Sequence, residues 1–421
     1  MSYPLNIVCL ATYFKGADFM RECKAHGCHV VLVTKEKMLR EDWPRESLED
    51  LIAVPNDAGP ALFIDLLAFL ARNRRIDRVV ALEEFDVVTA ALMREHLCLP
   101  GLSSSRAKVF RDKLSMAVHA TRAGINVPEF VPLVNRDEVT EFMERVPAPW
   151  IVKPRSDVSA IGIRKVSEAS EVMRTMDEMN ERENLRERAS SYLLARFVPG
   201  EVFHVDSVVN DGKVAFAGTN QYGRPPMQVA HQGGAYISRT LERGSADERA
   251  LLDANKKLVK ALGLERGATH AEFIKSDEDG KFYFLEIAAR VGGAYIAEVL
   301  EAASGVNLWR EWARLEIFDG RGASGYGRWT SGQGTSRPST PKIRPTRKDY
   351  AGIILSLAKQ EIPDTSSYVD EEITCRINKR HHAGLIVRSP YLTRINDLLS
   401  SYSQRFADDF VAVAPPPERP E

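Results

Sequence analysis

Short apolar runs alternate with stretches of helical spacing over the first hundred residues. A continuous apolar run at 5–11 and two largely apolar stretches, at 28–34 and 77–82, predict strands. Three others carry apolar residues at helical intervals and predict helices, at 16–26, 60–72 and 85–96. Strands that alternate with helices in this way form an open parallel α/β layer, so we expect such a domain over residues 1–105.

The pattern changes in the middle of the chain. Helical spacing predicts helices at 102–123, 167–188 and 251–262, and short apolar runs predict strands at 149–154, 192–200, 201–210 and 213–218. The turn formers Asp211-Gly212 join the last two strands, which is typical of an antiparallel meander. We therefore expect a second domain, built on antiparallel sheets, over residues 106–320.

The remaining chain predicts a linker and a small third domain, together residues 321–413. Residues 319–350 are rich in Gly, Ser, Thr, Pro and Arg and predict a long connection. A small α/β piece follows, with strands at 351–357 and 383–387 and a helix at 392–406. The tail at 414–421 reads A-P-P-P-E-R-P-E and is predicted to be disordered.

The most informative stretch is a predicted hairpin with two apolar strands, 271–275 and 282–288. If Gly280 ends a three-residue loop, Asp277 pairs with Lys281 and Glu272 lies directly opposite Glu286. Like charges so placed repel, and they do so here in a largely apolar setting, which favours a cation between them. Two unrelated surface glutamates are the alternative.

A divalent ion is the cation that this pair of carboxylates suits. Arg290 lies two alternations beyond Glu286 and faces the same side of an extended strand. Hard ions such as Mg²⁺ (or Mn²⁺) take carboxylate and phosphate oxygens together, so the set suits a nucleotide phosphate tail.

A second group of residues suits phosphate binding. Lys153 lies on the short strand 149–154, and the loop after it is made of small residues that include Ser156, Ser159 and Gly162. An ammonium and backbone N–H groups can both point at an anion in such a place. A single lysine on a predicted helix is usually solvated. Lys113 is therefore a candidate for phosphate binding only in combination with the strand of Lys153.

Bulk composition excludes several classes of function. A net charge of −1 over 421 residues gives no reason to expect nucleic acid or a membrane surface as a partner. The five cysteines show no paired spacing, so we expect buried free thiols in a reducing compartment. The sequence has no secretory signal pattern and no apolar run near the ~20 residues that span a bilayer. We therefore expect a cytoplasmic protein.

The first parallel layer does not favour a dinucleotide site. The turn after the first strand carries only Gly16, so the G-x-G-x-x-G fingerprint is missing and a dehydrogenase loses most of its support. Glu83-Glu84 follows a predicted strand at the edge where such sheets bind ligands. The pair could contact an amine substrate, but capping of the following helix is the more common role.

The order of these pieces resembles the ATP-grasp superfamily, and within it the biotin-carboxylase-like and carbamoyl-phosphate-synthase-like branch. The resemblance rests on Asp112-Lys113, the strand I-V-K-P at 151–154 with its loop, the hinge strand at 195–200 with Glu201, and Glu272 with Glu286-x-x-x-Arg290. It covers roughly residues 1 to 320. It implies ATP and Mg²⁺ (or Mn²⁺) as cofactors.

The resemblance also implies roles for individual residues. Lys113 and Lys153 would neutralise the α- and β-phosphates, with the small-residue loop beside them, and Glu272 and Glu286 would bridge one or two metal ions. Arg290 would be the catalytic residue that stabilises the departing γ-phosphate. The nucleoside would be bound by backbone groups at the adenine edge and side chains at the ribose, namely Arg196, Phe197, Val198, Glu201 and His231.

This chain departs from the superfamily pattern at two of these places. Ala195 stands where the hinge is often acidic, and Ala288 stands where an Asn often follows the second metal carboxylate. Metal coordination here would rest on two side chains plus water.

Members of the superfamily phosphorylate a carboxylate and let a nucleophile attack the acyl phosphate. A biotin carboxylase fits less well, because Ala294 stands where that enzyme's base would be and Gly233 replaces a lysine, although His231-Gln232 matches. Arg290-Val291-Gly292-Gly293 is similar to L-amino-acid ligases, which implies a carboxylate–amine ligase that joins small-molecule acids and amines, namely amino acids. A non-catalytic ATP-binding regulator is the third reading. Many members are dimers, so the resemblance leaves a homodimer open.

Overall fold

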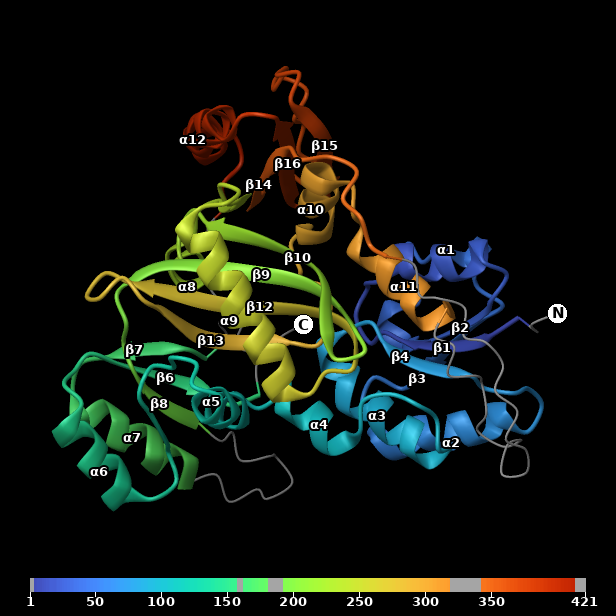
Figure 1. Ribbon diagram of the computed structural model, residues 1–421, viewed down its shortest axis with the longest axis horizontal. Coiled ribbons are helices and arrows are strands. Elements are labelled where there is room, and N and C mark those ends of the chain that lie inside the picture. Colours follow the sequence, from blue (N-terminus) through green and yellow to red (C-terminus); the bar gives the residue numbers. More distant parts are fainter. Residues whose placement is uncertain (1–3, 157–161, 181–191, 319–341, 413–421) are drawn as a thin grey trace.

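The computed structural model describes residues 4–156, 162–180, 192–318 and 342–412. Three sheets organise them (Figure 1). A parallel sheet near the N-terminus lies on one side, a small antiparallel sheet lies on the other, and a large eight-stranded sheet rises between and above them. The α/β class with one parallel layer and antiparallel sheets is as the sequence predicts.

The N-terminal sheet has the order β3-β2-β1-β4, and every neighbouring pair is parallel. Its strands are β1 (Asn6–Leu10), β2 (His29–Lys35), β3 (Asp50–Val54) and β4 (Arg78–Ala81). The helices around it are α1 (Ala17–Ala25), α2 (Pro60–Ala71) and α3 (Val87–His96), with 3-10 turns η1 (Glu36–Met38), η2 (Arg45–Ser47) and η3 (Glu84–Asp86). In this layer only β3 is absent from the sequence prediction; it is a short edge strand, mostly half-buried, whose apolar run is four residues long.

Two helices connect this layer to the next domain, where the sequence predicts one. The stretch divides into α4 (Ser104–Val109) and α5 (Lys113–Arg122). The break occurs because Asp112 leaves the helical conformation and its carboxylate accepts the N–H of Leu114, as an N-cap does. Lys113 therefore begins a helix instead of lying within one.

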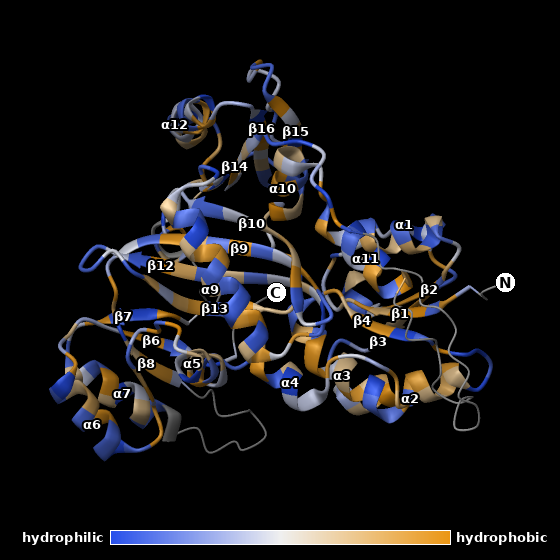
Figure 2. Ribbon diagram, viewed as in Figure 1, coloured by the Kyte–Doolittle hydropathy of each residue, from blue (hydrophilic) through white to orange (hydrophobic). Residues whose placement is uncertain are grey.

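The small sheet has the order β5-β8-β6-β7 and carries two helices on one face. Its strands are β5 (Phe130–Pro132), β6 (Trp150–Pro154), β7 (Arg164–Val166) and β8 (Tyr192–Arg196). Its helices are α6 (Arg136–Arg145) and α7 (Ala169–Asn180). Polar and apolar residues alternate along both helices (Figure 2), so each buries one side against the strands.

The large sheet has the order β13-β12-β9-β10-β11-β14-β16-β15. Its first five strands are β9 (Gly200–Asn210), β10 (Lys213–Tyr222), β11 (Tyr236–Thr240), β12 (Arg266–Ser276) and β13 (Phe282–Ala288). The C-terminal strands β14 (Tyr350–Leu357), β15 (Ile373–Lys379) and β16 (His382–Ser389) continue the same sheet, because β14 pairs with β11. The sequence predicts neither β15 nor this continuity.

Five helices accompany the large sheet in the described part of the chain: α8 (Pro226–Gln232), α9 (Ala246–Leu262), α10 (Ile296–Ser304), α11 (Leu308–Phe318) and α12 (Leu392–Asp409). Helix α9 is defined by its ends, because Ser245 accepts the N–H of Glu248 at its start and left-handed Gly263 closes it. The predicted tail at 414–421 and most of the linker lie outside the described residues.

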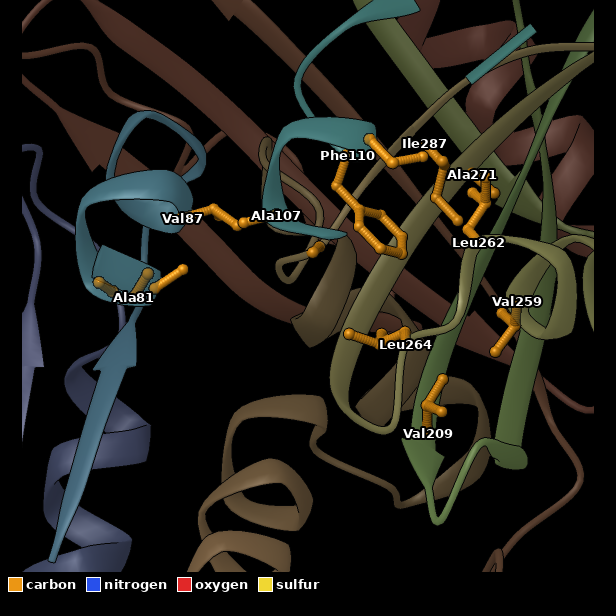
Figure 3. Packing of buried hydrophobic residues seen from close by; sticks show 14 of the residues in the cluster. Ala81, Val87, Ala107, Phe110, Val209, Val259, Leu262, Leu264, Ala271 and Ile287 are labelled. Carbon is orange, nitrogen blue, oxygen red and sulfur yellow. The ribbon is translucent and has the colours of Figure 1, made fainter. Parts of the chain in front are cut away.

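The main core joins the N-terminal layer to the large sheet. Figure 3 shows Val87 and Ala107 pointing toward one another and Phe110, at the end of α4, pointing toward Leu264 and Ile287. This packing fixes the carboxyl end of β4 beside the hairpin β12–β13.

All five cysteines are free, as expected, but two of them are exposed. Cys9, Cys23 and Cys28 are buried, whereas the expectation of burial is wrong for Cys98 and Cys375. Among the described helices, none combines the length and apolar character needed to cross a bilayer.

Candidate active site

The hairpin β12–β13 places Glu272 and Glu286 directly opposite each other, as predicted. The predicted turn is wrong, however, because Ser276 rather than Asp277 bonds Lys281 (Ser276 N to Lys281 O, 2.9 Å). Side-chain bonds from Ser276 and Asp279 to nearby N–H groups favour this four-residue loop. A bulge between the two glutamates and the turn then restores the register.

The two carboxylates have different partners. Lys113 Nζ lies 2.7 Å from Glu286 Oε2, and the Tyr222 hydroxyl donates to Glu272 Oε1 at 2.7 Å. Burial opposes ionisation of Glu286, but Lys113, together with Lys153 and His270, outweighs it and lowers the pKa of Glu286. A cation therefore already lies against one of the two predicted metal carboxylates.

Lys113 and Lys153 converge on these glutamates from separate elements. The N–H of Lys113 donates to Arg155 O at 2.8 Å, which joins the start of α5 to the end of β6. Burial and, after it, the charge of Lys113 lower the pKa of Lys153 to about 8, against the opposing pull of Glu286 and Glu272. Two lysines thus share a poorly solvated place, which suits them to a polyanion.

The small-residue loop after β6 is described only at its ends. Ser156 O accepts a hydrogen bond from Arg111 Nη2 at 2.7 Å. Gly162 has a φ of 71°, and a Cβ there would lie 2.8 Å from Pro154 Cγ, so the position requires glycine. Ser159 lies outside the described residues.

The predicted nucleoside-binding residues follow β8. The N–H groups of Arg196 and Phe197 donate to Glu129 O and Pro149 O, so their donors are used within the protein. The N–H group of Val198 takes part in neither of these two hydrogen bonds. Glu201 is exposed near the start of β9. His231 lies in α8, a short helix where a polar loop is expected, and its side chain lies outside the described residues.

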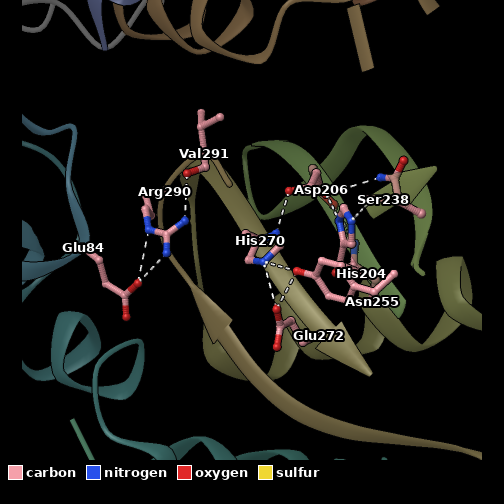
Figure 4. Close-up of polar contacts among 12 residues, drawn as sticks. Glu84, His204, Asp206, Ser238, Asn255, His270, Glu272, Arg290 and Val291 are labelled. Atoms are coloured by element: carbon pink, nitrogen blue, oxygen red, sulfur yellow. Dashed lines mark hydrogen bonds and ion pairs between the residues drawn. The ribbon is translucent and has the colours of Figure 1, made fainter. Parts of the chain in front are cut away.

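Arg290 follows the end of β13 and faces the N-terminal domain. Its Nη2 lies 2.8 Å from Glu84 Oε2 (Figure 4), and the other oxygen of Glu84 lies 2.5 Å from Arg111 Nη1. Burial opposes the charge on Arg290, but Glu84 and Glu83 outweigh it and raise the pKa of Arg290.

The capping role favoured for Glu83-Glu84 is wrong. Neither carboxylate caps a helix, because Glu83 pairs with Lys15 at 2.6 Å and Glu84 binds two arginines. Both glutamates are buried, and an ionised carboxylate so placed takes cations in preference to exposed N–H groups. Lys15 and Arg111 are site residues that the sequence interpretation missed.

Sequence reasoning also missed a buried polar cluster on the same face of the large sheet. Asp206 accepts from His204 Nδ1 at 2.6 Å and from His270 Nδ1 at 2.8 Å, and His270 Nε2 lies 3.3 Å from Glu272 Oε1 (Figure 4). Burial opposes protonation of His270, but Asp206 outweighs it and raises the pKa of His270 to about 10. The available signal was polar residues at every second position of otherwise apolar strands.

The residues present fit a divalent ion and a phosphate tail. Two carboxylates face each other, two lysines adjoin them, and the Lys113 ammonium lies against one of the carboxylates. Oxygen ligands of this kind are what Mg²⁺ prefers.

Two family models match this chain. The ATP-grasp N-terminal domain matches residues 20–101, and the ATP-grasp domain matches residues 146–298. The second match contains Lys153, Glu272, Glu286 and Arg290.

Curated relatives agree with these matches. An L-arginine-specific L-amino acid ligase of Bacillus subtilis is 23% identical over 58% of this chain and 58% of its own length. A D-alanine–D-alanine ligase of Neisseria gonorrhoeae is 24% identical over 48% of this chain and 65% of its own. The matches thus span between half and two thirds of these relatives.

Solved structures resemble nearly the whole chain. The L-amino acid ligase from Bacillus licheniformis has a TM-score of 0.72 at 17% identity, covering 98% of this chain and 99% of its own. N5-carboxyaminoimidazole ribonucleotide synthetase from Thermus thermophilus has a TM-score of 0.69 at 16% identity, covering 97% and 99%. With both family models and this fold, the chain belongs to the ATP-grasp superfamily.

Proposed function

We propose that the protein is an ATP-dependent carboxylate–amine ligase that joins two amino acids. The observation that carries the proposal is the register of Glu272 and Glu286, with Lys113 and Lys153 beside them. Such a set would hold the ion and the phosphates of a metal–nucleotide complex. The L-amino acid ligase among the relatives supports the choice of substrates.

The proposed reaction has two steps. An oxygen of the substrate carboxylate attacks the γ-phosphorus of ATP, and the bond to the ADP oxygen breaks to give an acyl phosphate. The amine nitrogen of the second substrate then attacks the carbonyl carbon, the bond to the phosphate oxygen breaks, and the nitrogen loses a proton. ADP, phosphate and an amide result.

The chain's own residues have separate tasks in these steps. Lys113 and Lys153 would hold the phosphates and offset their charge. Glu272 and Glu286 would hold Mg²⁺, which when bound supplies positive charge for phosphoryl transfer. Arg290 meets the γ-phosphate and the developing acyl phosphate.

The N-terminal domain supplies the features that favour an amino acid over bicarbonate. Lys15 with Glu83, and Arg290 with Glu84, bring two cations and two carboxylates to the same end of the site. A zwitterion matches both signs, because its carboxylate can replace a glutamate at a cation and its ammonium can replace a cation at a glutamate.

The test is phosphate release by the full chain with ATP and Mg²⁺, using amino acids singly and in pairs. We expect release with particular pairs, together with a product whose mass is the sum of the two less one water. Release that depends on bicarbonate would favour a carboxylase. Nucleotide binding without turnover on any pair would favour the regulator.

A further inference from the structure

The cluster around Asp206 lies on adjacent strands of the large sheet. His204 and Asp206 alternate on β9, and His270 and Glu272 alternate on β12. Asp206 pairs across the ladder with His270, and His204 pairs with Glu272. Side chains two apart share a face, so all four point to the side of the sheet that carries the predicted metal carboxylates.

Both ring nitrogens of His204 and both oxygens of Asp206 have defined partners. The two oxygens of Asp206 accept from two imidazoles, and His204 Nε2 lies 2.7 Å from the Ser238 hydroxyl. His270 donates to Asp206 through Nδ1, and its imidazolium form, which Asp206 favours, also donates from Nε2 to Glu272 Oε1, to which the Tyr222 hydroxyl donates as well. One oxygen of Glu272 is thereby fixed from two directions.

Stability alone does not explain why charged side chains are buried here. His204 and Asp206 are fully buried, and a carboxylate without solvent adds little net stability compared with apolar residues of the same shape. On the opposite face of the same strand a neutral side chain is buried instead, at a lower desolvation cost. Ser207 there accepts a hydrogen bond from Asn255 Nδ2 at 2.7 Å. A charged cluster beside Glu272 therefore indicates a role in the site.

The cluster also contacts the segment after Arg290. A Cβ on Gly292 would lie 2.8 Å from Asp206 Oδ1 and 3.0 Å from His270 Nδ1. Glycine is thus required where this segment packs on the two side chains. The same carboxylate adjoins both the strand of Glu272 and the segment that carries Arg290.

We propose that Asp206 is a positioning residue, which through His270 fixes the Glu272 carboxylate in the orientation that the metal ion needs. The inference rests on the proposed function only in that Glu272 holds the metal of a metal–nucleotide complex. Hydrogen bonds to a ligating carboxylate commonly govern metal affinity, and their loss costs about 10- to 100-fold.

The test compares Asp206→Asn with Ser207→Ala, its buried neighbour on the other face of β9. Binding of Mn²⁺ in the presence of ADP is measured by electron paramagnetic resonance, which needs no knowledge of the amino acid substrates. We expect Asp206→Asn to weaken Mn²⁺ binding about 10- to 100-fold and Ser207→Ala to leave it unchanged. Excess metal should restore bound Mn²⁺ in Asp206→Asn, which would not occur if the variant were only unfolded.

Tyr222→Phe serves as a second variant, because it removes one donor to Glu272 and keeps the ring. It should weaken Mn²⁺ binding in the same direction by a smaller factor. Equal Mn²⁺ affinity in Asp206→Asn, Tyr222→Phe and Ser207→Ala would overturn the inference. Mn²⁺ binding that persists in Glu272→Gln but is lost in Asp206→Asn would also overturn the inference. In that case His204, Asp206 and His270 would hold the ion themselves. If the unaltered chain binds no Mn²⁺ with ADP, the proposed function itself fails.

Discussion

The two ends of the candidate site differ in how their charged side chains are paired. At the metal end, formed by Glu272, Glu286, Lys113 and Lys153, each charge has a like charge as a neighbour, although Lys113 also pairs with Glu286. At the acceptor end, formed by Lys15, Glu83, Glu84, Arg111 and Arg290, each carboxylate meets a cation of its own.

The pKa directions of Lys153 and Arg290 follow this difference, although burial and the neighbouring Arg290 also lower the pKa of Lys15 at the acceptor end. The pKa of Lys153 falls, through burial and the nearby Lys113, whereas the pKa of Arg290 rises because its glutamates outweigh burial. The metal end is therefore incomplete without an ion and phosphates, while the acceptor end is complete and holds two domains together. Function should depend most on the first, and stability most on the second.

The largest effect is expected at the metal end. Glu286→Gln should lower ADP formation by about 100-fold or more, because one of the two metal carboxylates is lost. The fold should persist, since Lys113 keeps its backbone bond to Arg155. ADP release with both substrates measures the effect, and Glu178→Gln on the exposed side of α7 is the matched control. Near-normal turnover of Glu286→Gln would refute the metal assignment.

The acceptor end should respond differently to the same change. Glu84→Gln leaves Arg290 and Arg111 without their shared carboxylate, and breaking a buried pair costs about 3–5 kcal/mol of folding free energy. Urea unfolding measures this loss. A stability loss as small as that of Glu286→Gln would remove the contrast between the two ends.

The metal end should also show a pH dependence. Lys153, with a pKa of about 8, is charged below that pH and loses its proton above it, so kcat/KM for ATP should fall about tenfold per pH unit above pH 8. Bound phosphates favour the charged form, so kcat at saturating ATP should hold to higher pH. Lys153→Arg should shift the fall upward. A flat kcat/KM profile from about pH 7 to 10 would contradict the burial of Lys153.

The smallest effect is expected away from both ends. Ser245→Ala removes the N-cap of α9 and should cost about 1 kcal/mol of stability with no change in turnover. Urea unfolding and ADP release are measured together. A fall in turnover would mean that α9 transmits stability to the site, and the separation of function from stability would not hold.

The sequence predicted the fold class and the local motifs of the site well, because both depend on periodicity. The register of Glu272 and Glu286 is right although the turn is wrong, since a bulge offsets the longer loop. The strand of Lys153 is also right. Strands β3 and β15, both at the edges of their sheets, were missed; β15 mixes polar and apolar residues, whereas the apolar run of β3 is only four residues long.

Contacts between distant segments could not be predicted. Glu84 meets Arg290 across 206 positions, and Lys15 meets Glu83 across the parallel sheet, so neither pair leaves a local pattern. His204 and Asp206 were visible as polar residues in an apolar strand, but their partner His270 becomes evident only when the strand order is known.

The central claim is that a divalent ion lies between Glu272 and Glu286. A crystal of the full chain grown with Mn²⁺ and ADP, measured at the manganese absorption edge, tests it directly. We predict anomalous density between the two carboxylates of β12 and β13. Manganese bound elsewhere, with Lys113 still seated on Glu286, would contradict the account.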